Sequence, residues 1–429
     1  MKIHVIPIRP SASLATLWIA SLIALFVVSL KLSGMKGDGL DYYLYTEAFV
    51  RHATPDIRKA EFESSKQLEY PPQTSYESLG RGMGFRGETE VGSRGFYRSP
   101  GGGVYNYHFW LYPLLVAPVL WVVEAAGKPP FTAFSIVNFV FLIAALGYVW
   151  LCWRGESIQK HYLTGMMLFC GTPYYLAWPH PEVYTSCLLL LSLLALSDRR
   201  YVGASILSGL AAAQNPPIAA LVVLIAATGL WHMRTNAQSP SLMQNPVTFR
   251  RISGGFIAGL LIAALPMAFF KATFGAPSAI AALGYADPSL VSAGRVMSIF
   301  LDLNLGMLPN LPGLAVTLLA IPLLALTSRK KRDHGALACL CVLAAGCAVS
   351  AGMAVGSTAT INWNHGATVM SRYAYWLAVP LIFASALCLS WLSKPGHHCR
   401  PGTGGWMSVR LRRIQHVSCE SQRGELHNV

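Results

Sequence analysis

The feature that most constrains this chain is a series of long apolar segments that are almost free of charge, of which residues 12–30 are the first. As a helix, these 19 residues would be about 28 Å long, close to the ~30 Å thickness of the hydrocarbon core of a bilayer. Lys31 follows them and can reach the interface with its amino group. A cleaved signal peptide is the alternative, but its apolar part would be shorter, about 7–15 residues, and would lead into a cleavage site. The segment therefore predicts a membrane anchor.

Further apolar segments of similar or slightly smaller length follow along the chain. They cover residues 132–152, 163–178, 183–197, 201–213, 216–232, 252–270, 310–327, 335–355 and 373–393. Only 12% of all residues are charged and 53% are hydrophobic, whereas about a quarter of the residues of a soluble domain are charged. The sequence thus predicts an all-α polytopic membrane protein with about ten transmembrane helices.

The net charge of +14 comes from basic residues in short stretches between the apolar segments, a pattern that indicates membrane topology and no nucleic-acid partner. Residues 110–126 decide the orientation, because they are apolar but contain Pro113, Pro118 and Glu124. If they do not cross the membrane, 19 Lys and Arg residues lie in the segments on one side and three in the short loops on the other. The positive-inside rule then predicts that both termini are cytoplasmic and that residues 110–126 form a juxtamembrane helix in the outer leaflet.

This topology divides the chain into three parts. Residues 1–11 form a cytoplasmic N-terminus, residues 12–393 a membrane-embedded domain, and residues 394–429 a basic cytoplasmic tail that we predict to be disordered. Within the membrane-embedded domain, residues 34–131 form a long outer loop that includes the juxtamembrane helix. Residues 80–103 are rich in Gly and Arg and have no apolar period, so we expect a mobile loop there.

Most polar residues that are suited to chemistry fall on the predicted outer face. The densest stretch is residues 37–45, where two carboxylates and three tyrosines follow the first apolar segment. The other polar stretches of this face are residues 106–109, 179–182, 214–217, 271–309 and 362–373. The inner face has only basic loops and the tail, so we expect the protein to act on the outer side.

Five short motifs stand at the ends of the apolar segments. They are Gly37-Asp38-x-x-x-Tyr42, Asn106-Tyr107-His108-Phe109 with Pro113 and Pro118, Gly171-Thr172-Pro173-Tyr174-Tyr175 with His180 and Pro181, Asn304-Leu305-Gly306-Met307-Leu308 with Pro312, and Asn362-Trp363 with Arg372, Tyr373 and Pro380. In this order they resemble the GT-C superfamily of integral membrane glycosyltransferases. The match is best with its bacterial mannosyltransferase-like group, which is related to protein O-mannosyltransferases and to the lipid A aminoarabinose transferase. The resemblance implies a GT-C-like fold.

The resemblance also implies a function. The chain would transfer a sugar from a polyprenyl-phosphate-linked donor to an unidentified acceptor on the outer face of a bacterial inner or plasma membrane, periplasmic or extracellular. The transfer is expected to invert the anomeric carbon, with Asp38 as general base. An inverting displacement needs only this one carboxylate, because phosphate is already a good leaving group. The alternative is that Asp38 is only a turn residue between Gly37 and Gly39.

Several residues are predicted to bind the substrate. Arg372 is expected to hold the donor phosphate through its planar guanidinium, although snorkelling to the interface is an alternative. Lys271 and Arg295 are candidates for the same role. The remaining predicted substrate-binding residues are Tyr42, Asn106, His108, His180 and Asp41. For Asp41 we favour a place in the first turn of a helix over residues 40–51 rather than catalysis.

A divalent cation, Mg²⁺ or Mn²⁺, is an open cofactor prediction, since the resembled family contains metal-dependent and metal-free members. Asp38, His180 and Glu182 offer the oxygen and imidazole ligands for it. For Glu182, a helix-capping role is the favoured interpretation.

The sequence departs from the resembled family at two places, which keeps other function classes open. Gly39 follows Asp38 where a second adjacent acid is common, and Gln214-Asn215 stands where relatives often have an arginine. A non-catalytic subunit that binds polyprenyl lipids is therefore the main alternative. A transporter is less favoured, because its charged groups would lie in mid-membrane, whereas the apolar segments here contain almost none.

Overall fold

The computed structural model describes residues 12–68, 95–236, 246–282, 285–327, 334–361, 363 and 370–392. The predictions for residues 1–11 and 394–429 lie outside these residues, as do those for residues 80–94 and for Asn362 of the last motif. The described chain is mainly helical.

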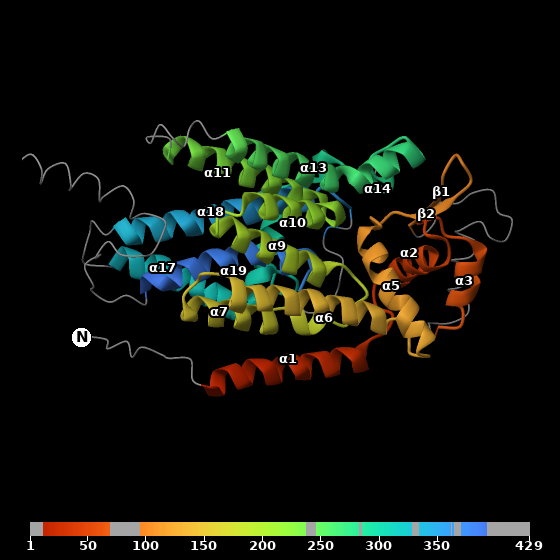
Figure 1. Ribbon diagram of the computed structural model, residues 1–429, viewed down its shortest axis with the longest axis horizontal. Coiled ribbons are helices and arrows are strands. Elements are labelled where there is room, and N and C mark those ends of the chain that lie inside the picture. The colour runs from red at the N-terminus through yellow and green to blue at the C-terminus, as the bar shows by residue number, and fades with distance from the viewer. Residues whose placement is uncertain are drawn as a thin grey trace, which may run out of the picture.

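Long apolar helices form a bundle whose axes run along the long dimension of the molecule (Figure 1). Its members are α1 (Ala12–Leu32), α6 (Thr132–Gly147) with the π-helical turn η1 (Tyr148–Cys152), α7 (Ser157–Phe169), α9 (Glu182–Ser197), α10 (Tyr201–Gln214), α11 (Ala219–Asn236) after η2 (Pro216–Ile218), α13 (Pro246–Phe274), α17 (Pro312–Thr327), α18 (His334–Ser357) and α19 (Arg372–Leu392). Short helices connect some of them, namely α8 (Thr172–Tyr175), α14 (Ala279–Ala282), η3 (Pro288–Leu290), α15 (Ala293–Leu301) and α16 (Met307–Asn310).

Within the described residues, six helices are long and apolar enough to cross a membrane. They are Leu14–Leu32, Thr132–Cys152, Pro216–Thr235, Phe249–Phe274, Gly335–Ser357 and Arg372–Ser390. This supports the predicted all-α membrane class. Helices also stand where the other four spans were predicted, but α7, α9, α10 and α17 have only 13 to 16 residues.

One predicted span is wrong as a single helix. Residues 163–178 contain the end of α7 at Phe169, a break, and the separate helix α8. The break is caused by Gly171, whose φ of +89° is a left-handed conformation that favours glycine. A Cβ atom there would also lie 2.5 Å from the ring of Tyr375. The turn brings the following residues back across the end of the bundle.

The bundle is organised around α19. In the apolar stretch of this helix 78% of the residues are buried, whereas only 6% are buried in the apolar stretch of α1. α1 lies at the edge of the bundle in Figure 1 and is attached by a few contacts. The Trp18 indole N–H donates to Nδ1 of His161 at 2.8 Å, and the Phe26 ring stacks on Phe139 with 4.2 Å between centroids. α1 is therefore a peripheral anchor that leads the chain toward the polar end of the molecule.

The described part of the predicted outer loop is a folded cap at one end of the bundle (Figure 1). It contains α2 (Gly39–His52), α3 (Lys59–Ser65), β1 (Phe96–Arg98), β2 (Val104–Asn106) and α5 (Leu111–Ala125). The described end of the predicted mobile loop is instead part of a β-hairpin, in which Tyr97 of β1 lies opposite Tyr105 of β2. Phe96 and Val104 are buried, so the hairpin has a core that its Gly-rich composition does not predict.

The helix α5 has two different apolar faces. Tyr112, Val116 and Leu120 are buried in the core that α5 shares with the rest of the cap, whereas Trp121 is 64% and Val122 56% exposed. In Figure 1, α5 lies across the end of the bundle rather than along it. An exposed apolar face in this position is the pattern expected of a helix at a lipid–water interface.

A buried amide joins the cap to the bundle. Asn138 of α6 is fully buried and accepts a hydrogen bond from the Tyr112 hydroxyl at 2.9 Å. Its Nδ2 donates to the carbonyl oxygens of Leu176 (3.3 Å) and Trp178 (3.0 Å). This fixes the turn that leads to His180 against the α5 helix of the cap.

Candidate active site

Asp38 lies where the chain leaves α1 and turns into α2. Gly37 permits the turn with a φ of +53°, and Asp38 occupies the position that precedes the helix, but its side chain makes no capping hydrogen bond. Instead, Oδ2 accepts a hydrogen bond from Nη1 of Arg372 at 2.8 Å and lies 3.4 Å from Nε2 of His108. Asp38 is thus a turn residue by backbone position, while its carboxylate belongs to a polar cluster.

Arg372 is the first residue of α19, and its side chain is only 10% exposed. Its guanidinium is directed to Asp38 inside the protein rather than to the exposed surface. Nε has no hydrogen-bond partner within the described residues, and the guanidinium carbon lies 5.4 Å from the ring centroid of Tyr373. A buried guanidinium with a spare donor is suited to a phosphate or carboxylate.

Tyr42 stands between two imidazole rings. Its ring stacks on His108 at 4.7 Å between centroids, with an angle of 21° between the planes, and lies 5.0 Å from His180. Burial lowers the pKa of both histidines, against the opposing effect of the nearby carboxylates, so both imidazoles are neutral at pH 7. The permanent positive charge beside Asp38 therefore comes from Arg372.

The two carboxylates of the cluster have opposite pKa shifts. Burial would raise the pKa of Asp38, but the hydrogen bond of His108 and the nearby guanidinium of Arg372 lower it well below its usual range. Burial and the nearby charge of Asp38 raise the pKa of Asp41. A pair whose pKa values are pushed apart is a common feature of sites where one carboxylate stays ionised and its neighbour holds a proton.

Asn106 positions His108 rather than facing the cavity. Its Oδ1 accepts a hydrogen bond from the backbone N–H of His108 at 2.8 Å, and its carbonyl oxygen accepts one from the Tyr45 hydroxyl at 2.5 Å. Its side chain also opposes the upward pKa shift of Asp41. Asn106 is therefore a positioning residue of this cluster.

The residues that suit a cation differ from the predicted set. Ligand atoms of Asp38, Asp41 and His108 lie within 4.8 Å of one another. His180 instead directs Nε2 toward the carbonyl oxygen of Lys36, at 3.3 Å, and Nδ1 toward Oε2 of Glu182, at 3.7 Å. Two carboxylates and an imidazole fit Mn²⁺ or Mg²⁺ in donor type, although Arg372 already occupies one oxygen of Asp38.

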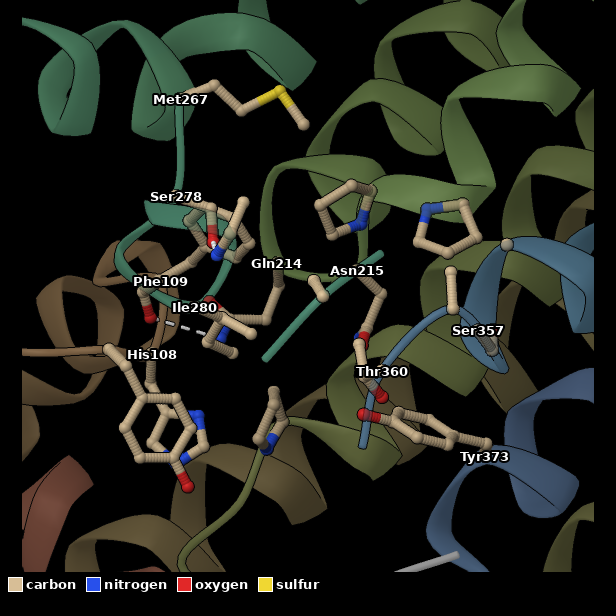
Figure 2. A pocket seen from close by; sticks show the side chains of 18 of the residues that line it. His108, Phe109, Gln214, Asn215, Met267, Ser278, Ile280, Ser357, Thr360 and Tyr373 are labelled. Carbon is tan, nitrogen blue, oxygen red and sulfur yellow. Dashed lines mark hydrogen bonds between the residues drawn. The ribbon is translucent and has the colours of Figure 1, made fainter. Parts of the chain in front are cut away.

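A cavity of ≈ 340 Å³ opens beside this cluster, between the cap and the adjoining ends of the bundle helices. Its polar lining includes Tyr42, His108, Glu182 and Arg372, and its apolar lining includes Met267, Ile280, Ala281 and Ala286. Figure 2 shows His108 and Phe109 on one side and Ser357, Thr360 and Tyr373 on the other, with Gln214 and Asn215 between them. The cavity thus combines a charged end with an apolar wall, as a ligand with a polar head and an apolar chain requires.

Gln214, which stands where an arginine was expected, has a structural role. Its Nε2 donates to the carbonyl oxygen of Phe109 at 3.0 Å (Figure 2), and its Oε1 accepts from the N–H of Tyr112 at 3.2 Å. Asn215 donates to the Thr185 hydroxyl at 2.7 Å. Both amides hold the walls of the cavity in place.

The other two predicted phosphate ligands are bound to the backbone. Arg295 donates to the carbonyl oxygens of Thr358 and Thr360, and Lys271 donates to that of Gly275. Of the described basic residues with a predicted phosphate role, only Arg372 lines the cavity.

Tyr107 and Thr360 also line the cavity. Sequence reasoning placed Tyr107 mainly among interfacial aromatic residues, and it missed Thr360. Tyr107 directly precedes His108 in the same motif, so its place at the cavity could have been predicted from that motif. Thr360 had no such signal, because it follows α18 in a segment that is placed by pairing with Ala286.

No protein-family model, curated protein or solved structure matches this chain. The resemblance to GT-C glycosyltransferases therefore rests on the sequence motifs alone.

Proposed function

We propose that this protein transfers a sugar from a polyprenyl-phosphate-linked donor to an acceptor on the outer face of a membrane. The observation that carries the proposal is the pairing of Asp38 with Arg372 at 2.8 Å beside the cavity. It joins a carboxylate suited to accept a proton with a guanidinium suited to hold phosphate. The two residues are 334 positions apart in the sequence, so the fold brings them together.

In the proposed reaction, an acceptor hydroxyl oxygen attacks the anomeric carbon of the donor sugar. The bond between that carbon and the phosphate oxygen breaks, and polyprenyl phosphate leaves with Arg372 as its counter-charge. Asp38 takes the hydroxyl proton. One carboxylate base and one displacement give inversion at the anomeric carbon.

The ion pair also explains when Asp38 becomes a base. While Arg372 contacts it, Asp38 has a low pKa and accepts protons poorly. A donor phosphate that draws the guanidinium away removes the part of this stabilisation that Arg372 provides, and the pKa of Asp38 rises, while the hydrogen bond of His108 remains. Donor binding would therefore activate the base.

The apolar wall of the cavity suits the lipid part of the donor. Met267 comes from α13, and Ile280 and Ala281 come from α14, near the end of the bundle that carries the cap (Figure 1). A polyprenyl chain on this side would leave its phosphate near Arg372. A cation on Asp38, Asp41 and His108 would add a second counter-charge for the phosphate.

The proposed function also requires a particular orientation of the protein in the membrane. Ten crossings with cytoplasmic termini would place the cap and the cavity on the periplasmic or extracellular side of a bacterial inner or plasma membrane. The exposed apolar face of α5, with Trp121 and Val122, would then lie in the outer leaflet. Accessibility of cysteines introduced into the cap and into residues 237–245 to an impermeant reagent tests this arrangement.

The function is tested with the purified protein in liposomes, a panel of radiolabelled polyprenyl-phosphate sugars, and an envelope extract as acceptor, with and without a chelator. The proposal expects label on the acceptor, release of polyprenyl phosphate, and inversion of the anomeric centre. Loss of transfer with chelator would assign a cation to the site.

Two outcomes would favour the other function classes. Binding of polyprenyl phosphate without transfer of any sugar would indicate a non-catalytic lipid-binding subunit. Movement of the sugar or lipid across the membrane without transfer would indicate a transporter. The polar cluster at one end of the bundle, rather than in mid-membrane, argues against transport.

A further inference from the structure

Glu182 lines the cavity and also stands in the first turn of α9, where the helix-capping interpretation places it. It is the first residue of α9, and its side chain is only 6% exposed. Its Oε2 is buried and has no hydrogen-bond partner within the described part of the chain. The nearest basic group is Nδ1 of His180 at 3.7 Å, which is too far for a hydrogen bond and is also without a partner within the described residues.

An unpartnered carboxylate oxygen in this position is costly. A buried acceptor without a donor gains nothing to offset the loss of its water, and the cost is larger for a charged acceptor. The arrangement makes sense if a ligand brings its own hydrogen-bond donor to Glu182.

Thr360 is a second unpartnered group of the same cavity. Its Oγ1 is buried and has no hydrogen-bond partner within the described residues, although its backbone is well fixed. Its carbonyl oxygen accepts from Arg295 at 3.2 Å, and its backbone pairs with Ala286. Figure 2 shows Thr360 on the side of the cavity opposite His108. A rigid backbone with a free hydroxyl is a preformed contact for a ligand.

The chemistry of these two groups selects one part of the proposed donor. A phosphate would be repelled by the Glu182 carboxylate and attracted by Arg372. A hydrocarbon chain would leave both Glu182 and Thr360 unpaired. A neutral ring with several hydroxyl groups can donate to the carboxylate and exchange a hydrogen bond with the threonine hydroxyl.

We infer that Glu182 and Thr360 form the subsite that binds hydroxyl groups of the transferred sugar, and that Glu182 determines which sugar is accepted. This inference rests on the proposed function for the identity of the ligand. It assigns Glu182 a role in specificity, separate from the phosphate role of Arg372 and the base role of Asp38.

The test compares Glu182→Gln and Thr360→Val with a control, Glu63→Gln, in the purified full-length protein. Glu63 is an exposed acid of α3 that pairs with Lys66 at 2.6 Å and does not line the cavity. Binding of two probes is measured, namely polyprenyl phosphate alone and the same lipid with a neutral hexose. Melting temperatures show whether each variant is folded.

For Glu182→Gln, we expect affinity for the hexose-carrying lipid to fall about 10- to 100-fold, since a hydrogen bond to a charged group contributes roughly 1.5–3 kcal/mol. Thr360→Val should lose about 3- to 10-fold. Affinity for polyprenyl phosphate alone should change less than about twofold in both variants, and Glu63→Gln should match the wild type with both probes.

Three results would overturn the inference. One is an equal loss with both probes, which would mean that Glu182 is only structural. Another is unchanged hexose binding in a folded Glu182→Gln variant. The third is a preference for an amino sugar over its hydroxyl counterpart, because the carboxylate would then pair with an amine. If sugar-dependent binding holds but the wild type transfers nothing, the subsite stands and the proposed transfer fails.

Discussion

Replacing Asp38 with Asn should separate donor binding from chemistry. The account assigns Arg372 to two partners in turn, Asp38 in the free protein and phosphate in the complex. Asparagine keeps the size of Asp38 but removes its charge and basicity. Asp38→Asn should therefore bind polyprenyl phosphate more tightly than the wild type, even though it cannot accept the proton.

The size of this gain follows from the geometry of the pair. At 2.8 Å, two unit charges attract by about 6 kcal/mol at an effective dielectric constant of about 20. Desolvation offsets most of this, and the Asp38 side chain is 32% exposed, so the net contribution is about 1–2 kcal/mol. Relief of that competition corresponds to a dissociation constant about 5- to 30-fold lower.

The assay is equilibrium binding of a fluorescent polyprenyl phosphate to purified wild type and Asp38→Asn, at low salt and matched melting temperature. Glu63→Gln again serves as the charge-matched control. Weaker binding by Asp38→Asn would refute the reasoning, because it would mean that Asp38 itself helps to hold the phosphate, for example through a cation. Equal binding would mean that the ion pair does not compete with the ligand.

Further predictions concern the same cluster and its support. Arg372→Lys keeps the charge but loses the guanidinium fork, so polyprenyl phosphate should bind about 10-fold more weakly in the same assay. Because Asp38 has a lowered pKa when folded, its stabilising contribution is present above the ordinary value of about 3.9 and is lost as pH falls below it. The melting temperature of the wild type should therefore decline more between pH 5 and pH 3 than that of Asp38→Asn. Asn138→Leu leaves the carbonyl oxygens of Leu176 and Trp178 unpaired, and should destabilise the protein by about 1–3 kcal/mol in a detergent melting assay.

Much of the bundle could be predicted from sequence because apolar length and charge placement act locally. The predicted span over residues 12–30 agrees with the bounds of α1 to within two residues, and the predicted span over residues 335–355 covers almost all of α18. The exception was residues 163–178, where the hydropathy averaged over the whole segment hides the effect of one glycine. Gly171 ends the helix through its backbone conformation and the close approach of Tyr375, neither of which hydropathy detects.

The cap was harder to predict because its order depends on distant partners. The hairpin around Tyr97 and Tyr105 is too short to be recognised by its own pattern. It is supported by the pairing of Ile57 with Val104, about fifty residues apart, and by the contact of Tyr105 with Phe269 of α13. Such contacts belong to the tertiary structure, so the local Gly-rich composition was misleading.

The candidate site, too, could be predicted from local sequence only in part. Asp38, Tyr42, His108 and Arg372 could be predicted to lie together, because each belongs to a motif at the same end of the bundle. Which side chains point at one another could not. His180 was grouped with Asp38 as a metal ligand, yet its ring is directed to Lys36 and Glu182. Ring orientation depends on the packing of Tyr42, which one sequence does not reveal.

The most direct test of the account is the rate of sugar transfer by purified wild type and Asp38→Asn at saturating donor. A general base contributes about 10²- to 10⁴-fold to the rate of proton transfer. The account predicts transfer by the wild type and a loss of that size in Asp38→Asn, with donor binding retained or strengthened. Equal rates in the two proteins would contradict it, because Asp38 would then be only a turn residue with an ion-pair partner.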